Sequence, residues 1–192
     1  MRKLSVFESV SLDGYFKAAS GDIAWMHQGG DDPEFQSFTA ANAAGGGVLL
    51  MGRTTYELFA SHWPTPQAMQ QMPEVAGPMN AMPKVVVSRS LGKATWNNTK
   101  VLKGDLAAEV RKLKAEPGEA ITVLGSGSIV SQLTQAGLVD EFQVVVVPVA
   151  LGDGRTMFEG VKNMLTLRLV TSRTFRNGRV FLVYEPHEAP DG

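Results

Sequence analysis

Two short turns combine glycine with hydroxyl side chains, and each follows an apolar run and precedes a helical pattern. Their residues are Gly52, Arg53, Thr54 and Thr55 in the first turn, and Gly125, Ser126, Gly127, Ser128 and Ile129 in the second. Backbone N–H groups at a helix start bind anions, and glycine lets a phosphate come close to the backbone. An ordinary strand-to-helix connection explains either turn alone. Both turns in one parallel sheet predict a diphosphate held between two helix starts.

A third strand end carries further side chains suited to a phosphate. Ser88 and Arg89 follow the apolar run 85–87, and together with Arg53 they could hold a phosphate monoester. A solvated strand end is the alternative. The second turn is not a complete dinucleotide fingerprint, because Val130 replaces the third glycine and no acid follows about 20 residues on.

The composition argues against several other kinds of chemistry. The 192 residues contain no cysteine, which excludes disulfides, thiolate metal sites and a cysteine nucleophile. The three histidines, His27, His62 and His187, lack metal-ligand spacing, so we expect no metal site. No GxSxG motif supports a serine nucleophile. With 18 basic against 19 acidic residues, the charge predicts no binding to nucleic acid or to an anionic membrane.

Alternating strand and helix patterns predict a largely parallel sheet with helices on both faces. The strand patterns cover 4–12, 48–51, 83–88, 96–102, 120–124 and 140–149. The last pattern, 166–185, predicts an antiparallel hairpin around Asn177-Gly178, expected as a type I′ turn with positive φ at both residues. Residues 64–83 hold five of the ten prolines and predict a surface excursion with a short helix.

The length predicts one domain, over residues 1–186, with a disordered tail at 187–192. Glu8 and Asp13 interrupt the apolar start, so we expect no signal peptide. No apolar run approaches the roughly 20 residues of a membrane span, and a cytoplasmic protein is the expectation.

The order of the motifs resembles the dihydrofolate reductase superfamily. The segments that carry the resemblance are MGRTTYE (51–57), VVSR (86–89) and GSGS (125–128). Two more, SLDGYF (11–16) and GDIAW (21–25), are closer to the branch related to the C-terminal reductase domain of the bacterial riboflavin-synthesis enzyme. The resemblance covers about residues 2–185. It implies a three-layer α/β fold with a mixed, mostly parallel sheet and a C-terminal antiparallel hairpin.

The resemblance also implies an NADPH-dependent reductase. It assigns the two glycine-rich turns to the diphosphate of the cofactor, and Arg53, Ser88 and Arg89 to its adenosine 2′-phosphate. The hydride would pass to a small heterocyclic or carbonyl substrate, of which a phosphoribosylaminouracil of the riboflavin pathway is one example. Because the chain has no cysteine, the zinc deaminase domain that usually accompanies the riboflavin reductase is not expected within it.

Three residues are candidates for the catalytic end of the site. The resemblance places Asp13 and Trp25 in segments that would border nicotinamide and substrate, and Glu34 near the carboxylate with which folate-reducing members hold the pterin. Each has a structural alternative: a turn for Asp13, core packing for Trp25 and dipole compensation for Glu34. Met82 lies where folate reducers carry an arginine, which argues against folate as the substrate.

Two further expectations stay open at this point. A non-catalytic nucleotide-binding or regulatory module on the same fold is the rival function, because no acid aligns cleanly with that of the folate reducers. The valine-rich strand and the hairpin predict a homodimer surface, as in the riboflavin branch, although strands of a core show the same pattern.

Overall fold

An eight-stranded sheet with the order β5-β4-β3-β6-β1-β7-β10-β9 forms the centre of the computed structural model, which describes residues 1–125 and 127–187. Its strands are β1 (Leu4–Ser11), β3 (Val48–Gly52), β4 (Lys84–Val87), β5 (Thr99–Leu102), β6 (Ile121–Leu124), β7 (Glu141–Val147), β9 (Leu167–Thr174) and β10 (Val180–Pro186). From β5 through β4, β3, β6 and β1 to β7, each strand runs parallel to its neighbour. β10 runs antiparallel to β7, and β9 runs antiparallel to β10. The predicted mixed sheet is confirmed.

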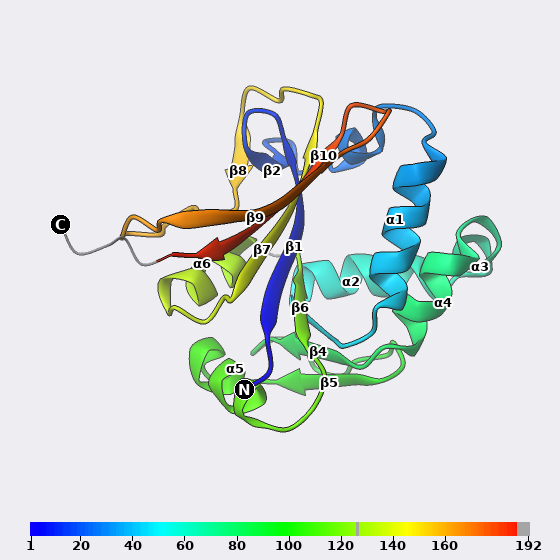
Figure 1. Ribbon diagram of the computed structural model, residues 1–192. Helices are drawn as coiled ribbons and strands as arrows, with labels where there is room; N and C mark the ends of the chain where they lie inside the picture. The colour runs from blue at the N-terminus through cyan, green and yellow to red at the C-terminus, as the bar shows by residue number, and fades with distance from the viewer. Residues whose placement is uncertain (126, 188–192) are drawn as a thin grey trace.

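Helices cover both faces of this sheet, as Figure 1 shows. One face carries α1 (Pro33–Ala44), α2 (Arg53–His62), α3 (Pro66–Gln71) and α4 (Pro73–Ala81), and the other carries α5 (Leu106–Ala115) and α6 (Gly127–Gln135). A short 3-10 helix, η1 (Ala24–His27), and the two-stranded pair β2 (Tyr15–Ala18) and β8 (Gly154–Thr156) complete the fold. Within the described ranges, no helix has the length and apolar character needed to cross a membrane.

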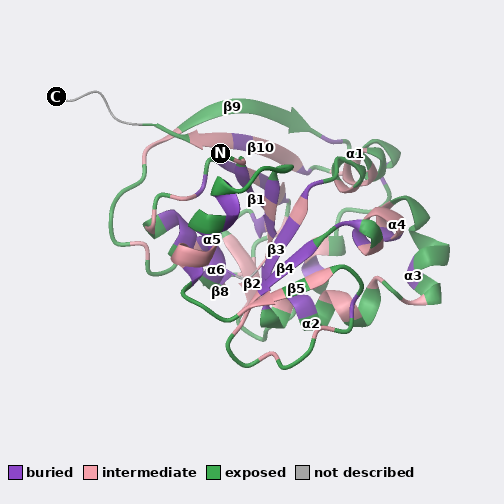
Figure 2. Ribbon diagram, turned by 90° about the horizontal axis from the view of Figure 1, so that it is seen from below, coloured by how far each residue is buried: buried purple, intermediate pink, exposed green. Residues whose placement is uncertain are grey.

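The central strands are apolar on both sides because helices bury both faces of the sheet. In β3, Leu50 packs into the cluster that contains α5 and α6, whereas Leu49 and Met51 pack into the cluster of α2 and α4. Figure 2 shows these inner strands as buried and the edge strand β9 as largely exposed. Val144, Val145 and Val147 of β7 are buried within the chain. The hairpin therefore remains the exposed part of the predicted homodimer surface, which stays a prediction.

The segment 64–83 lies largely at the surface, as predicted, but it also contributes residues to the core and contains more than one short helix. It forms two helices, α3 and α4, and a proline occupies the first position of each. Ala76, Met79 and Met82 are buried, and the two methionines pack with Tyr56 and Trp96. Pro66 and Pro73 therefore mark helix starts, whereas Pro78 lies inside α4. The two buried methionines fill the space between helix and sheet.

The hairpin between β9 and β10 is confirmed, but its turn is not of type I′. The backbone has a positive φ at Gly178 (82°) and not at Asn177. The amide of Phe175 donates to the carbonyl of Arg179 (2.9 Å), and the amide of Gly178 donates to the carbonyl of Phe175 (3.0 Å). This is a three-residue loop with glycine in the left-handed position. The carboxylate of Asp32 accepts a hydrogen bond from the amide of Asn177 (3.0 Å) and ties the turn to α1.

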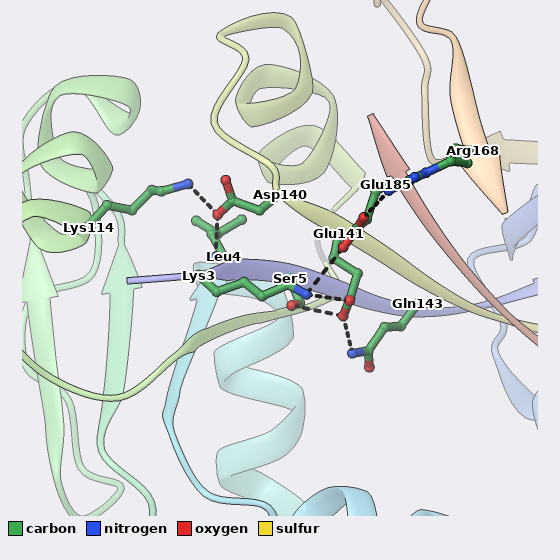
Figure 3. A network of polar contacts seen from close by, with 9 residues as sticks. All are labelled: Lys3, Leu4, Ser5, Lys114, Asp140, Glu141, Gln143, Arg168 and Glu185. Atoms are coloured by element: carbon green, nitrogen blue, oxygen red, sulfur yellow. Dashed lines mark hydrogen bonds and ion pairs between the residues drawn. The ribbon is translucent and has the colours of Figure 1, made fainter. Parts of the chain in front are cut away.

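Charged side chains are paired at the amino end of the sheet (Figure 3). The ammonium group of Lys114 donates to the carboxylate of Asp140, which also accepts a hydrogen bond from the amide of Leu4 (2.7 Å). Lys3 forms an ion pair with Glu141 (2.6 Å). These contacts fix β1, β7 and α5 to one another. Of the predicted C-terminal tail, 188–192 lies outside the described residues.

Lys84, at the start of β4, holds α4 in place. Its side chain is 1% exposed, and its ammonium group donates to the carbonyls of Asn80 (3.1 Å), Met82 (2.7 Å) and Asn97 (3.3 Å). It also lies 4.3 Å from the ring centroid of Trp96. Burial lowers the pKa of Lys84 to about 8.

We expect Lys84→Met to lower the free energy of unfolding by about 2 to 3 kcal/mol, because methionine fills the space but leaves buried carbonyls without a donor. Urea unfolding measures this change. Lys100→Met, at an exposed position of the neighbouring strand β5, is the matched control and should change little. Equal stability of the two variants would contradict the assigned role of Lys84.

Candidate active site

A cavity of about 590 Å³ lies at the carboxyl edge of the sheet and extends beneath α1, α2 and α4. Both glycine-rich turns border it. Thr54 and Thr55 line the cavity from the first turn of α2, and Gly125, Gly127 and Ser128 line it from the start of α6. The structure therefore brings together two predicted anion-binding segments that are about 70 residues apart in the sequence.

The parallel register of the sheet explains why the two turns meet. β3 and β6 are neighbours, with Leu50 opposite Val123, so that both strands end at the same level. The backbone of Gly125 has a φ of +60°, and a Cβ there would lie 3.2 Å from the side chain of Thr55. A Cβ at Gly127 would overlap the ring of Phe16. The turn packs so closely against α2 and β2 that side chains larger than hydrogen have no room.

The donors around the cavity fit an anionic group. Two helices begin at the cavity wall, and the hydroxyl side chains of Thr54 and Ser128 add further donors. Lys17 and Arg155 are the basic residues among those that line it, and both come from the β2–β8 pair. These groups suit the diphosphate of a dinucleotide. Ser126 lies outside the described residues, and Ile129 is buried in the core beside α5.

Arg53, Ser88 and Arg89 lie on neighbouring strand ends next to the first turn. Gly52, just before Arg53, pairs with Val87, just before Ser88. Arg53 is half-exposed and lies 3.7 Å from the carboxylate of Glu57. The hydroxyl of Ser88 accepts a hydrogen bond from the amide of Leu91 (3.0 Å) and Arg89 is exposed. None of the three is among the described residues that line the cavity; they lie at the surface beside it.

Asp13 belongs to a loop network. Its carboxylate accepts hydrogen bonds from the hydroxyl of Ser11 (2.6 Å) and from the amides of Leu151 (3.0 Å) and Gly152 (2.7 Å). The bond from Ser11 is the largest cause that lowers its pKa to about 2. Asp13 therefore joins the end of β1 to the loop after β7, which is the structural alternative considered for this residue.

Trp25 and Glu34 also lie apart from the cavity lining. Trp25 is 7% exposed and packs in a core cluster with Val145 and Val147. Glu34 forms an ion pair with Arg173 on β9 (2.7 Å). In the described part of the chain, the lining includes none of the three predicted catalytic residues, Asp13, Trp25 and Glu34. Asp13 and Trp25 thus have the turn and core contacts of their structural alternatives, and Glu34 has an ion-pair partner on β9. The three catalytic assignments stay predictions.

Glu8 on β1 is a cavity residue that the sequence analysis did not single out. Its side chain is largely buried, and its Oε1 accepts a 3.3 Å hydrogen bond from the amide of Ser9. Its Oε2 is buried and has no hydrogen-bond partner among the described residues. Burial raises the pKa of Glu8 to about 8. A signal was available, because Leu4, Val6 and Val10 alternate with period two and place Glu8 among them on the buried face of β1 that packs against α5 and α6.

The fold is a mixed α/β domain with a cavity of ligand size at the carboxyl edge of its sheet. The family model of the RibD C-terminal domain matches residues 2–181. The chain therefore belongs to the RibD C-terminal domain family, which confirms the resemblance to the riboflavin branch.

Relatives and solved structures agree with this assignment. The chain is 30% identical to the uncharacterized protein YyaP of Bacillus subtilis, over 95% of this chain and 94% of YyaP. It is 26% identical to the uncharacterized protein YwjB of the same organism, over 91% of this chain and 92% of YwjB. A putative riboflavin biosynthesis protein from Shewanella sp. PV-4 shares the fold with a TM-score of 0.77, at 21% identity over 97% of this chain and 99% of that one. A pyrimidine reductase-like protein from Corynebacterium diphtheriae shares the fold with a TM-score of 0.64, at 13% identity over 98% of this chain and 93% of that one.

The buried carboxyl of Glu8 predicts a pH dependence of stability. Its pKa rises from 4.5 to about 8 on folding, so the folded state binds more protons than the unfolded state between these values. Stability from this group is complete below pH 4.5 and is lost as the pH rises through about 8. The loss is at most about 5 kcal/mol.

Glu8→Gln removes this proton equilibrium. The variant should therefore gain stability relative to the unmodified protein as the pH rises from about 5 to about 8. Urea unfolding at several pH values gives the difference between the two proteins. A difference that does not change with pH would show that Glu8 does not titrate in this range.

Proposed function

We propose that the protein is an NADPH-dependent reductase that transfers a hydride to a small heterocyclic or carbonyl substrate. The observation that carries this proposal is that both glycine-rich turns open on one cavity that also has an apolar wall, formed by α2 and α4. Membership of the RibD C-terminal domain family supports a reductase-like role. The pyrimidine reductase-like name of one protein with the same fold agrees with it.

In this proposal the two helix starts hold the diphosphate of the cofactor. Thr54, Thr55 and Ser128 supply hydroxyl groups, and the close packing at Gly125 and Gly127 brings the backbone to the phosphates. Arg53 and Arg89, beside the first turn, would contact the adenosine 2′-phosphate and favour NADPH over NADH. When bound, the reduced nicotinamide supplies the hydride. The chain positions the cofactor and excludes water from its reactive end.

The other half of the cavity suits the uncharged ring or the carbonyl group of a substrate. Apolar side chains of α2 and α4 form this wall, and they are Leu58, Phe59, Trp63, Val75, Met79 and Met82. Basic residues in the lining come from β2 and β8 instead. A phosphorylated pyrimidine of riboflavin synthesis would therefore place its ring on the apolar wall and its phosphate near Lys17 and Arg155.

Titration with NADPH and NADH, followed by nicotinamide fluorescence, tests the cofactor assignment. We expect saturable binding with a preference for NADPH. Arg53→Ala and Arg89→Ala should each weaken NADPH binding by roughly tenfold and leave NADH binding nearly unchanged, since one charged contact contributes about 1.4 kcal/mol. Arg168→Ala, in an exposed ion pair with Glu185 at the far edge of the sheet, is the control.

The outcomes separate the parts of the proposal. No saturable binding of either nucleotide would refute the reductase function. Tight NADPH binding that is unchanged in Arg53→Ala would refute only the role of that arginine. Oxidation of NADPH by members of a panel of pyrimidines, other heterocycles and carbonyl compounds is expected. Binding without turnover across the panel would instead favour a nucleotide-binding regulatory module on this fold.

A further inference from the structure

Glu8 is the single acidic residue that lines the cavity within the described part of the chain. It lies on β1, which the sheet places between β6 and β7. The last pair between β1 and β6 joins Phe7 to Leu124, so Glu8 is the first residue of β1 beyond the end of β6. It therefore lies at the carboxyl edge, beside the turn that begins at Gly125.

The hydrogen bonding of this carboxyl group is incomplete. The amide of Ser9 donates to Oε1, whereas Oε2 has no partner among the described residues and is shielded from water. Buried polar atoms in folded proteins are nearly always paired, and an unpaired one costs about 1 to 3 kcal/mol. Glu8 lines the cavity, so a small rotation of its carboxyl group toward a bound molecule would complete these hydrogen bonds.

The surroundings of Glu8 favour its protonated form. Its partner on β7 is Val144, and its neighbours on the same face of β1 are Val6 and Val10. The charged groups that share the cavity are Lys17 on β2 and Arg155 on β8, and Arg155 already pairs with Glu159 (2.9 Å). No ion pair joins Glu8 to either cation in the described structure. Desolvation is the main cause that raises the pKa to about 8, so the group carries a proton at neutral pH.

We propose that Glu8 is the proton donor of the reduction, an inference that rests on the proposed reductase function. The carbon of a C=O or C=N bond in the substrate accepts the hydride of the reduced nicotinamide. The π electron pair moves onto the oxygen or nitrogen, and this atom takes the proton from the carboxyl group of Glu8 as the O–H bond of that group breaks. The substrate gains two electrons and two hydrogens, the nicotinamide is oxidised, and water later reprotonates the carboxylate of Glu8.

The other acids considered at this edge are less suited to the role. The carboxylate of Asp13 accepts three strong hydrogen bonds that favour its ionised form, and Glu34 is held by Arg173. A general acid works best when its pKa is near the operating pH. A buried, uncharged carboxyl also leaves the cavity free of a negative charge that would repel an anionic cofactor.

The first test does not need a substrate. Carboxyl-carbon NMR of the full-length protein with labelled glutamate should show one signal that titrates near pH 8 and is missing in Glu8→Gln. We expect saturating NADP⁺ to change the chemical shift or the midpoint of this signal. Glu116→Gln is the control, because it removes an exposed carboxyl at the end of α5 and so identifies the signal of Glu116. We expect NADP⁺ to leave the signal of Glu116 unchanged.

The second test measures NADPH oxidation with the best substrate of the panel, from about pH 6 to about pH 10. In the unmodified protein, the rate should fall about tenfold per pH unit above about pH 8 as Glu8 loses its proton. Glu8→Gln should be slower by roughly 100-fold to 10,000-fold at neutral pH, with a profile that no longer falls above pH 8. Its Kd for NADPH should stay within about threefold of that of the unmodified protein.

Failure of this inference can be told apart from failure of the reductase function. If Glu8→Gln keeps the rate and the pH profile, or if NADP⁺ leaves the Glu8 signal unchanged, Glu8 is not the donor and the reductase function stands. If the variant loses NADPH binding as well as turnover, Glu8 has a structural role only. If the unmodified protein neither binds NADPH nor oxidises it, both proposals fail together.

Discussion

The side-by-side parallel pairing of β3, β6 and β1 is the constraint on which the candidate site depends. Val123 of β6 lies opposite both Leu50 of β3 and Val6 of β1, so all three strands run to the same edge of the sheet. The chain must leave each strand at this edge, and after β3 and β6 it enters a helix at once. The helix starts that face the cavity are therefore a consequence of strand order, as is usual for open α/β sheets. The β2–β8 pair and α4 form further walls of the cavity next to these helix starts.

Buried charged side chains have different partners at the two edges of the sheet. At the amino edge, Lys114 forms an ion pair with Asp140 and Glu141 forms one with Lys3, whereas the buried ammonium group of Lys84 donates to backbone carbonyls. At the carboxyl edge, Glu8 is equally inaccessible and has no ion-pair partner among the described residues. The same strand, β1, begins in the first environment and ends in the second. The charged groups of Lys84, Lys114 and Glu141 all have polar partners, whereas one carboxyl oxygen of Glu8 has none among the described residues, and this difference agrees with the role proposed for Glu8.

The sequence predicted those parts of the fold that depend on local patterns. The strands 48–51 and 120–124 and the glycine-rich turns after them are short apolar runs followed by helix starts, and their pairing follows from parallel order. Residues whose roles depend on distant partners were harder to predict. The turn at Asn177 is fixed by Asp32, and the burial of Met79 depends on Tyr56 and Trp96. The motif of Asp13 predicted a turn or a place beside the ligand, and only the structure shows its partners, the hydroxyl of Ser11 and amides that follow β7.

The apolar wall of the cavity is positioned by polar groups that lie behind it. The side-chain amide of Asn80 on α4 donates to the carbonyl of Trp63 (2.9 Å), and its oxygen accepts a hydrogen bond from the indole of Trp96 (2.7 Å). Lys84 in turn binds the carbonyls of Asn80 and Met82 at the end of α4. Trp63 and Met82 both line the cavity, so this network sets the distance between α2 and α4. The shape offered to a substrate thus depends on hydrogen bonds outside the cavity as well as on the apolar side chains that line it.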